Sequence, residues 1–111
     1  MGIFSNRTAF KNISPEQAKA IMDGDGSWIL LDVRTEEEFR EKHIKGARLI
    51  PDYEIAERAE AELKDKAAVI LVYCASGARS ARACKVLADM GYTNVSNFGG
   101  IFAWPYGTTE K

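Results

Sequence analysis

The chain has 111 residues, enough for one domain with a single core, and its 46% apolar and 28% charged residues are typical of a soluble globular protein. The net charge of -1 and the absence of a long apolar run argue against nucleic acid and a membrane as partners. Two cysteines without a framework pattern predict reduced thiols and a cytoplasmic location. We expect one domain over residues 1–111, with an ordered core at about 10–107 and no secretory segment at the start.

Short apolar runs alternate with helical patterns along the whole chain. The predicted strands cover residues 9–13, 28–33, 48–50, 69–73 and 95–98. The predicted helices begin after Ser14 and Thr35 and cover 52–63, 80–90 and 101–104, the last of them after a turn at Gly99 and Gly100. Gln17 and Glu38 lie three positions after Ser14 and Thr35, which is the spacing of a capping box. Strands that alternate with helices predict an α/β fold, with a central parallel sheet and helices on both faces.

The segment from Val69 to Met90 is the most informative part of the sequence. A buried strand over 69–73 runs into the loop Cys74–Arg79 and then a helix. Backbone N–H groups and the helix dipole favour negative charge at such a junction, so the Cys74 thiol should have a lowered pKa. Arg79 adds a fixed positive charge. A cysteine after a buried strand is commonly just a small apolar residue, but Gly77 and Arg79 together favour an anion site here.

Four motifs in order resemble the rhodanese family of sulfurtransferases. They are LDVRTEEEF at 31–39, HIKGARLIP at 43–51, CASGARS at 74–80 and GGIFAW at 99–104. The resemblance covers about residues 13–107. It implies a rhodanese-like fold with a parallel sheet of five strands, and it implies that 74–80 is the active-site loop.

The resemblance also implies a chemistry that the residues support. Cys74 is expected to take the outer sulfur of thiosulfate or of a persulfide donor, to hold it as a persulfide, and to pass it to cyanide or a thiol. A thiol-bearing partner protein is a further possible acceptor. The backbone N–H groups of the loop are expected to surround the sulfur and Arg79 to hold the anionic donor. The expected substrate-binding residues are Ala75, Ser76, Gly77, Ala78, Arg79 and Ser80, with no cofactor and no metal.

Two other functions stay open at this point. Phosphatases and arsenate reductases on the same fold have one more residue between the cysteine and the arginine, whereas four residues separate Cys74 from Arg79 here. The shorter loop favours sulfur transfer. Interaction modules of this fold typically lose the cysteine, which this chain retains.

The remaining notable residues are expected to be structural. Asp32 and Arg34 should pair with loop groups or with Glu38. His43, the only histidine, is structural at this position in the family that the chain resembles. Cys84 and Trp104 lie at positions that predict burial in the core.

Overall fold

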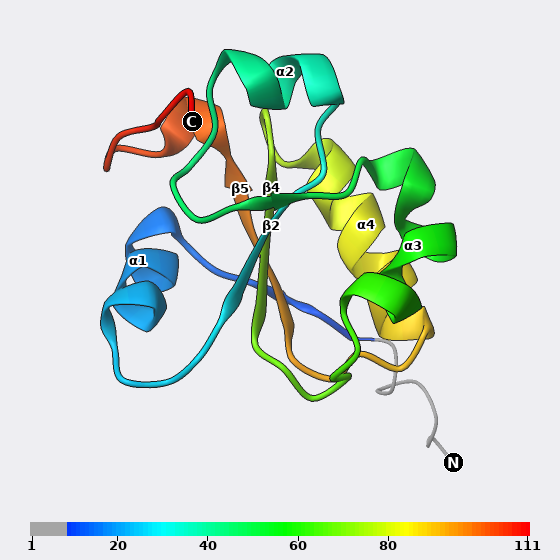
Figure 1. Ribbon diagram of the computed structural model, residues 1–111. Helices are drawn as coiled ribbons and strands as arrows, with labels where there is room; N and C mark the ends of the chain where they lie inside the picture. Colours follow the sequence, from blue (N-terminus) through cyan, green and yellow to red (C-terminus); the bar gives the residue numbers. More distant parts are fainter. Residues whose placement is uncertain (1–8) are drawn as a thin grey trace.

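The computed structural model describes residues 9–111, in which five strands form one parallel sheet (Figure 1). The strands are β1 (Lys11–Asn12), β2 (Ile29–Asp32), β3 (Arg48–Leu49), β4 (Ile70–Cys74) and β5 (Val95–Gly100). Their order across the sheet is β1-β5-β4-β2-β3, and every pair is parallel. The sheet places β4 at its centre, between β5 and β2. The α/β fold expected from the sequence is therefore confirmed.

Helices cover both faces of this sheet (Figure 1). The helices are α1 (Pro15–Asp23), α2 (Glu36–Glu41), α3 (Ile55–Glu62) and α4 (Ala78–Asp89), with short 3-10 turns η2 (Asp52–Glu54) and η3 (Ile101–Ala103). Figure 1 shows α1 on one side of the sheet and α3 and α4 on the other. Successive strand residues point to opposite faces, so Leu71 and Tyr73 pack with Ala18 of α1, whereas Val72 packs with Leu87 of α4. The two faces thus form two separate apolar clusters.

The two capping boxes expected from the sequence are present. Ser14 and Thr35 accept from the backbone N–H groups of Gln17 and Glu38, and the side chains of Gln17 and Glu38 accept in return from the caps. Each box satisfies N–H groups that a helix start leaves without partners. The starts of α1 and α2 therefore follow directly from local sequence.

Several predicted boundaries differ from the structure, and among them Cys74 ends β4 instead of beginning the loop. The segment expected as one helix over 52–63 begins with the 3-10 turn η2 before α3. Helix α4 begins at Ala78 instead of Ser80, because Gly77 has a φ of +115° and acts as its N-cap. Gly99 and Gly100, expected to form a turn, belong to the end of β5. The earlier start of α4 shortens the loop after Cys74.

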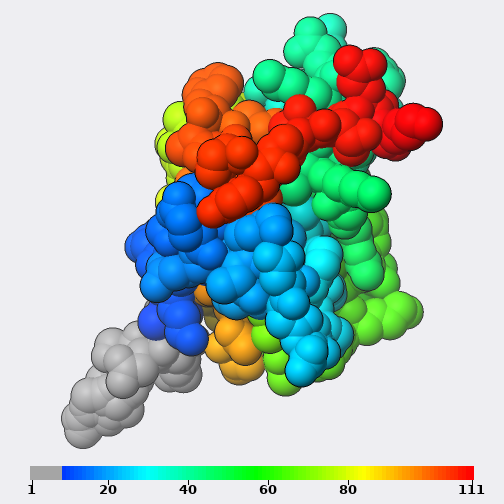
Figure 2. All heavy atoms as spheres, turned by 90° about the vertical axis from the view of Figure 1, so that its left-hand side faces the viewer, coloured from blue at the N-terminus to red at the C-terminus, as the bar shows by residue number. Residues whose placement is uncertain are grey.

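The C-terminal segment returns to the region that precedes β3. The backbone groups of Thr109 and His43 exchange two hydrogen bonds of 2.8 Å in an antiparallel bridge. In Figure 2 the red C-terminal end lies against the green segment at residues 43–47. Within residues 9–111, no helix is both long enough and apolar enough to cross a membrane.

Candidate active site

Cys74 is the last residue of β4, at the carboxyl edge of the sheet. Ligands of open parallel sheets bind at this edge. The residue is only 1% exposed and packs with the apolar cluster on the α4 face. Its partner across the sheet is Gly100 of β5, after a shift in register from Val72. Cys74 is therefore held at the end of a strand whose residues are all buried, and almost none of its surface is exposed.

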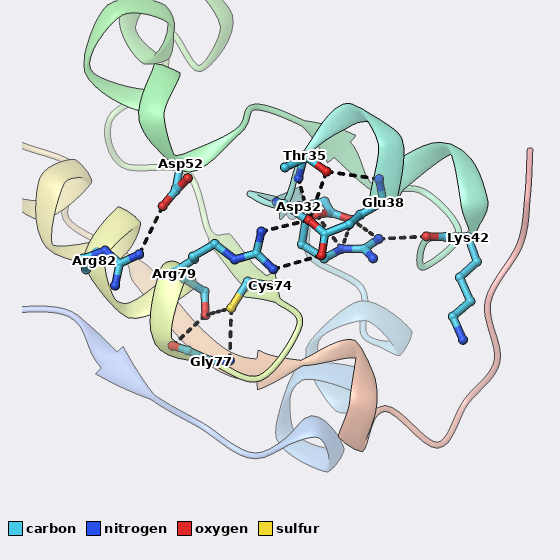
Figure 3. A network of polar contacts seen from close by, with 11 residues as sticks. Asp32, Thr35, Glu38, Lys42, Asp52, Cys74, Gly77, Arg79 and Arg82 are labelled. Atoms are coloured by element: carbon cyan, nitrogen blue, oxygen red, sulfur yellow. Dashed lines mark hydrogen bonds and ion pairs between the residues drawn. The ribbon is translucent and has the colours of Figure 1, made fainter.

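The loop that follows turns its polar groups towards the Cys74 sulfur. The backbone N–H of Gly77 donates to Sγ over 3.0 Å, and Sγ lies 3.3 Å from the Ser80 hydroxyl (Figure 3). Gly77 adopts left-handed backbone geometry, which glycine accepts without strain. Helix α4 then runs for 12 residues from this point, with its positive dipole end at the loop. The arrangement fits a sulfur anion.

Two opposing effects set the acidity of Cys74. Burial is the largest single influence and raises the pKa of the thiol. Hydrogen bonds from the Ser80 side chain and from the backbone N–H groups of Ser80, Gly77 and Ser76 lower it. Together they outweigh burial, so the pKa of Cys74 lies below its usual value of 9.0. A lowered pKa increases the fraction of the nucleophilic thiolate at neutral pH.

The end of β5 lies against the other side of the loop. A Cβ built on Gly100 would lie 1.9 Å from the Ala75 carbonyl oxygen and 2.6 Å from the Ser76 nitrogen. The same carbonyl accepts from the backbone N–H of Phe102 over 3.2 Å. The backbones of β5 and the loop therefore approach each other at a distance that only glycine permits.

Arg79 lies in the first turn of α4 and reaches across to α2 (Figure 3). Its Nη1 and Nη2 donate to the two carboxylate oxygens of Glu38 over 2.8 and 3.0 Å. This bidentate pair, together with hydrogen bonds from Thr35, holds the pKa of Glu38 well below its usual value, at about 2. The expected cation is thus present near the loop, but a carboxylate offsets its charge.

Arg34 follows one of the two alternatives expected from sequence, because it binds a loop group and not Glu38. Arg34 binds Asp32 through a buried ion pair of 2.7 Å and donates to the Lys42 carbonyl over 2.8 Å. Its partners are therefore Asp32 and a loop carbonyl, while Glu38 belongs to Arg79. The network joins the end of β2 to the end of α2, which supports the segment that carries Glu38.

The structure assigns different contacts to the loop residues proposed from sequence. Gly77 contacts the sulfur through its N–H, whereas Ala75 contributes a carbonyl that binds Phe102. Ser80 contributes its hydroxyl as well as its backbone N–H. Ala78 begins α4.

Other residues considered from sequence have structural surroundings. Cys84 is completely buried, and burial together with the nearby Cys74 raises its pKa to about 12, so it stays a thiol. His43 stacks on Phe39 with ring centroids 3.8 Å apart, and its Nδ1 lies 2.8 Å from the Phe39 carbonyl. Trp104 is 9% exposed and packs in the second apolar cluster, as expected. In the part of the chain that the structure describes, no three His, Cys, Asp or Glu side chains are grouped to hold a metal.

Three contacts of the site were not found by sequence reasoning. They are the Glu38–Arg79 pair, the approach of Gly100 to Ala75, and a 2.7 Å hydrogen bond from Ser80 to Asn97. Each joins residues that are far apart in the chain and adjacent only after the sheet has formed. The Gly99–Gly100 pair was the one local signal, and it marks the close approach instead of a turn.

Comparison with known proteins agrees with this geometry. Residues 14–105 match the family model described as a rhodanese-like domain. The chain is 42% identical over 74 residues to thiosulfate sulfurtransferase PspE of Escherichia coli, which covers 67% of this chain and 69% of that protein. It is 43% identical over 77 residues to a sulfurtransferase of Allochromatium vinosum, covering 68% and 70%. A solved structure described as rhodanese with anions from E. coli superimposes with a TM-score of 0.72 and 34% identity, covering 77% of this chain and all of that one. The chain therefore belongs to the family of rhodanese-like domains.

Proposed function

We propose that the protein is a sulfurtransferase in which Cys74 receives a sulfane sulfur from thiosulfate or a persulfide and passes it to a thiophilic acceptor. The observation that carries this proposal is the environment of the Cys74 sulfur. A hydrogen bond from the Gly77 N–H, the Ser80 hydroxyl and a helix start surround it and lower its pKa. The names of the related sulfurtransferases support the same reaction class.

In the first half-reaction the Cys74 thiolate attacks the outer sulfur of thiosulfate. A new sulfur–sulfur bond forms while the bond inside thiosulfate breaks, and its electron pair leaves on sulfite. The enzyme keeps a persulfide anion, so no oxidant or reductant is needed. The loop N–H groups and the dipole of α4 stabilise the charge on the transferred sulfur.

In the second half-reaction an acceptor removes the outer sulfur. Cyanide or a thiolate attacks it, the persulfide bond breaks, and its electron pair regenerates the Cys74 thiolate. The acceptor is a small thiophile or a thiol on a partner protein, because each supplies a nucleophile that attacks the outer sulfur. The cycle is a two-step covalent mechanism with ping-pong kinetics.

Arg79 orients the donor while Glu38 holds Arg79. A guanidinium has five N–H donors, and two of them bind Glu38. The remaining N–H groups serve an anionic donor, although the neighbouring carboxylate reduces the net attraction. A persulfide donor with little charge near its sulfane sulfur is therefore as suitable for this site as dianionic thiosulfate.

Mass spectrometry after incubation with thiosulfate tests the proposal. The intact chain is expected to gain the mass of one sulfur, located on the peptide that contains Cys74, and to lose it on addition of cyanide. Cys74→Ser should gain none, whereas the matched variant Cys84→Ser should gain the same mass as the natural chain. A panel of thiosulfate and small persulfides then ranks the donors. If none of them loads Cys74, the protein is an interaction module instead of a sulfurtransferase.

A further inference from the structure

The Ser80 hydroxyl lies among more acceptors than it can serve. It is completely buried, 2.7 Å from Asn97 Oδ1, 3.1 Å from the Gly77 carbonyl and 3.3 Å from the Gly99 carbonyl. It is also 3.3 Å from the Cys74 sulfur. A hydroxyl has one proton to donate and two lone pairs. Ser80 can therefore donate to only one of these groups at a time, and Asn97 is the nearest.

The oxygen of Asn97 is held towards Ser80 by contacts on both sides of the amide. Oδ1 accepts from the Gly99 N–H over 3.0 Å, and Nδ2 donates to Asn12 Oδ1 over 3.2 Å. A flipped amide would place its NH₂ against the Gly99 N–H, so these contacts fix the orientation. Asn97 lies on β5 opposite Asn12 on β1 and Val72 on β4, and it is 8% exposed. Asn97 is thus a fixed acceptor next to the Cys74–Ser80 pair.

The protonation state of Cys74 changes what Ser80 has to do. A Cys74 thiol donates its S–H to Ser80, which then donates to Asn97. A thiolate has no proton and needs a donor, so the Ser80 hydroxyl has to turn from Asn97 to sulfur. We propose that Asn97 is a positioning residue that competes with the Cys74 sulfur for the single Ser80 proton and thereby adjusts the acidity of the nucleophile.

Asn97 still has a hydrogen-bond donor when Ser80 no longer donates to it. Its oxygen keeps the Gly99 N–H when Ser80 turns away, so the change requires no unpaired buried group. A thiolate can therefore form at neutral pH, but competition from Asn97 reduces the stabilisation that the Ser80 hydrogen bond gives to it. A less acidic thiol is also a stronger nucleophile once ionised, which favours sulfur transfer.

The charged and titratable groups on the elements packed around this network include Arg79, Arg82 and Cys84 on α4, Glu38 on α2, Asp52 in η2, Lys11 on β1, and Asp32, Arg34 and Tyr73 at or just after the ends of β2 and β4. A neutral substitution at Asn97 changes none of these charges. A shift in Cys74 acidity in such a variant therefore reports on the hydrogen bonds.

The test is a thermodynamic cycle on the pH dependence of Cys74 alkylation by iodoacetamide, followed by mass spectrometry of its peptide. Asn97→Ala should shift the midpoint down by about 0.3–1 unit, and Ser80→Ala should shift it up by a similar amount, the size of one hydrogen bond. With Ser80→Ala already present, Asn97→Ala should have no further effect. An unchanged midpoint in Asn97→Ala, or an equal shift with and without Ser80, overturns the proposal.

A second variant covers the case in which Asn97→Ala does not fold. Asn97→Asp keeps an acceptor for both Gly99 and Ser80 and strengthens it. Its added charge raises the midpoint by itself, so the competition is measured as the larger upward shift expected with Ser80 present than with Ser80→Ala. An equal upward shift with and without Ser80 contradicts the competition. The inference rests on the proposed function only in treating Cys74 as the nucleophile. Because alkylation needs no sulfur donor, an inactive sulfurtransferase with the expected midpoints would reject the function and keep the role of Asn97.

Discussion

Gly100 offers the sharpest test of how the sheet shapes the candidate site. A methyl group at this position would lie 1.9 Å from the Ala75 oxygen, 2.3 Å from its carbonyl carbon and 2.6 Å from the Ser76 nitrogen. Ordinary contact begins at 3.4 Å, so in Gly100→Ala the two backbones must separate by at least 1.5 Å, the difference between these distances. The obstacle is backbone on both sides, which no side-chain rotation relieves. The loop after Cys74 therefore has to shift relative to the end of β5.

This displacement is expected to affect activity more than stability. Overpacking of this kind costs about 1–3 kcal/mol of folding free energy. A misplacement of about 1 Å in a catalytic array costs on the order of 100-fold in rate. The loop carries the Gly77 N–H that lies 3.0 Å from the Cys74 sulfur, so that contact is lost first. We therefore expect kcat/KM for sulfur transfer from thiosulfate to cyanide to fall by about 100-fold or more, with the pKa of Cys74 moving back towards its usual value.

The matched control is Gly26→Ala. A Cβ on Gly26 has no neighbour within 4 Å, and the residue is in the loop after α1, on the far side of the fold from Cys74 along the strands. This variant should keep natural activity and stability. Circular dichroism and a urea titration confirm that Gly100→Ala is folded before its rate is compared. A folded Gly100→Ala enzyme with natural kcat/KM and a natural Cys74 midpoint would refute the reasoning that this close approach positions the loop.

Three further changes test other parts of the site, and one of them, Glu38→Gln, is used for two measurements. Cys84→Ser should retain sulfur transfer but lower the free energy of unfolding by about 1–3 kcal/mol, because it buries a hydroxyl; a urea titration measures this, and loss of sulfur loading would contradict it. Glu38→Gln keeps a capping group at α2 and releases the charge of Arg79, so KM for thiosulfate should fall about two- to fivefold, and an increase would oppose the proposed role of Arg79. The folded pKa of Glu38, about 2 against a usual 4.5, means that its stabilisation is present above pH 4.5 and is lost as the pH falls towards 2; acid unfolding of Glu38→Gln should lack this part of the loss. One Gly inserted after Gly77 should weaken sulfur transfer, while the natural chain should not hydrolyse a phenyl phosphate ester, and phosphatase activity through Cys74 would restore the phosphatase interpretation.

Elements with a local cause were predicted well from the sequence. The capping boxes at Ser14 and Thr35 define helix starts within four residues, and the apolar run before Cys74 has no amphipathic alternative. The placement of Cys74 at the carboxyl edge followed from the strand–helix order alone. Such signals depend only on residues that are close in the chain, so they can be read from the sequence alone.

Contacts between distant segments were not accessible in the same way. Arg79 and Glu38 lie 41 positions apart, and the motif at 74–80 contains no indication of a carboxylate partner. Asn97 and Ser80 are 17 positions apart and meet because β5 lies beside β4. The strand order, with β5 inserted between β1 and β4, is a property of the sheet and is not written in any one segment. Contacts at the two edges of the loop therefore had to come from the structure.

The strand order also explains why the site has its particular balance of charge. Because β4 is central, the loop after Cys74 has β5 on one side and the continuation of β2 on the other. From β5 come only neutral groups: the amide of Asn97 and the backbone of Gly99 and Gly100. From the side of β2 comes α2, whose Glu38 binds the one arginine in the first turn of α4. The Cys74 sulfur is thus stabilised mainly by N–H dipoles and a hydroxyl instead of by an uncompensated cation. Dipoles at fixed positions favour an anion on the sulfur itself, whereas a free cation would favour any anion nearby. This selectivity is what the proposed mechanism requires, because it places the charge on the transferred sulfur atom.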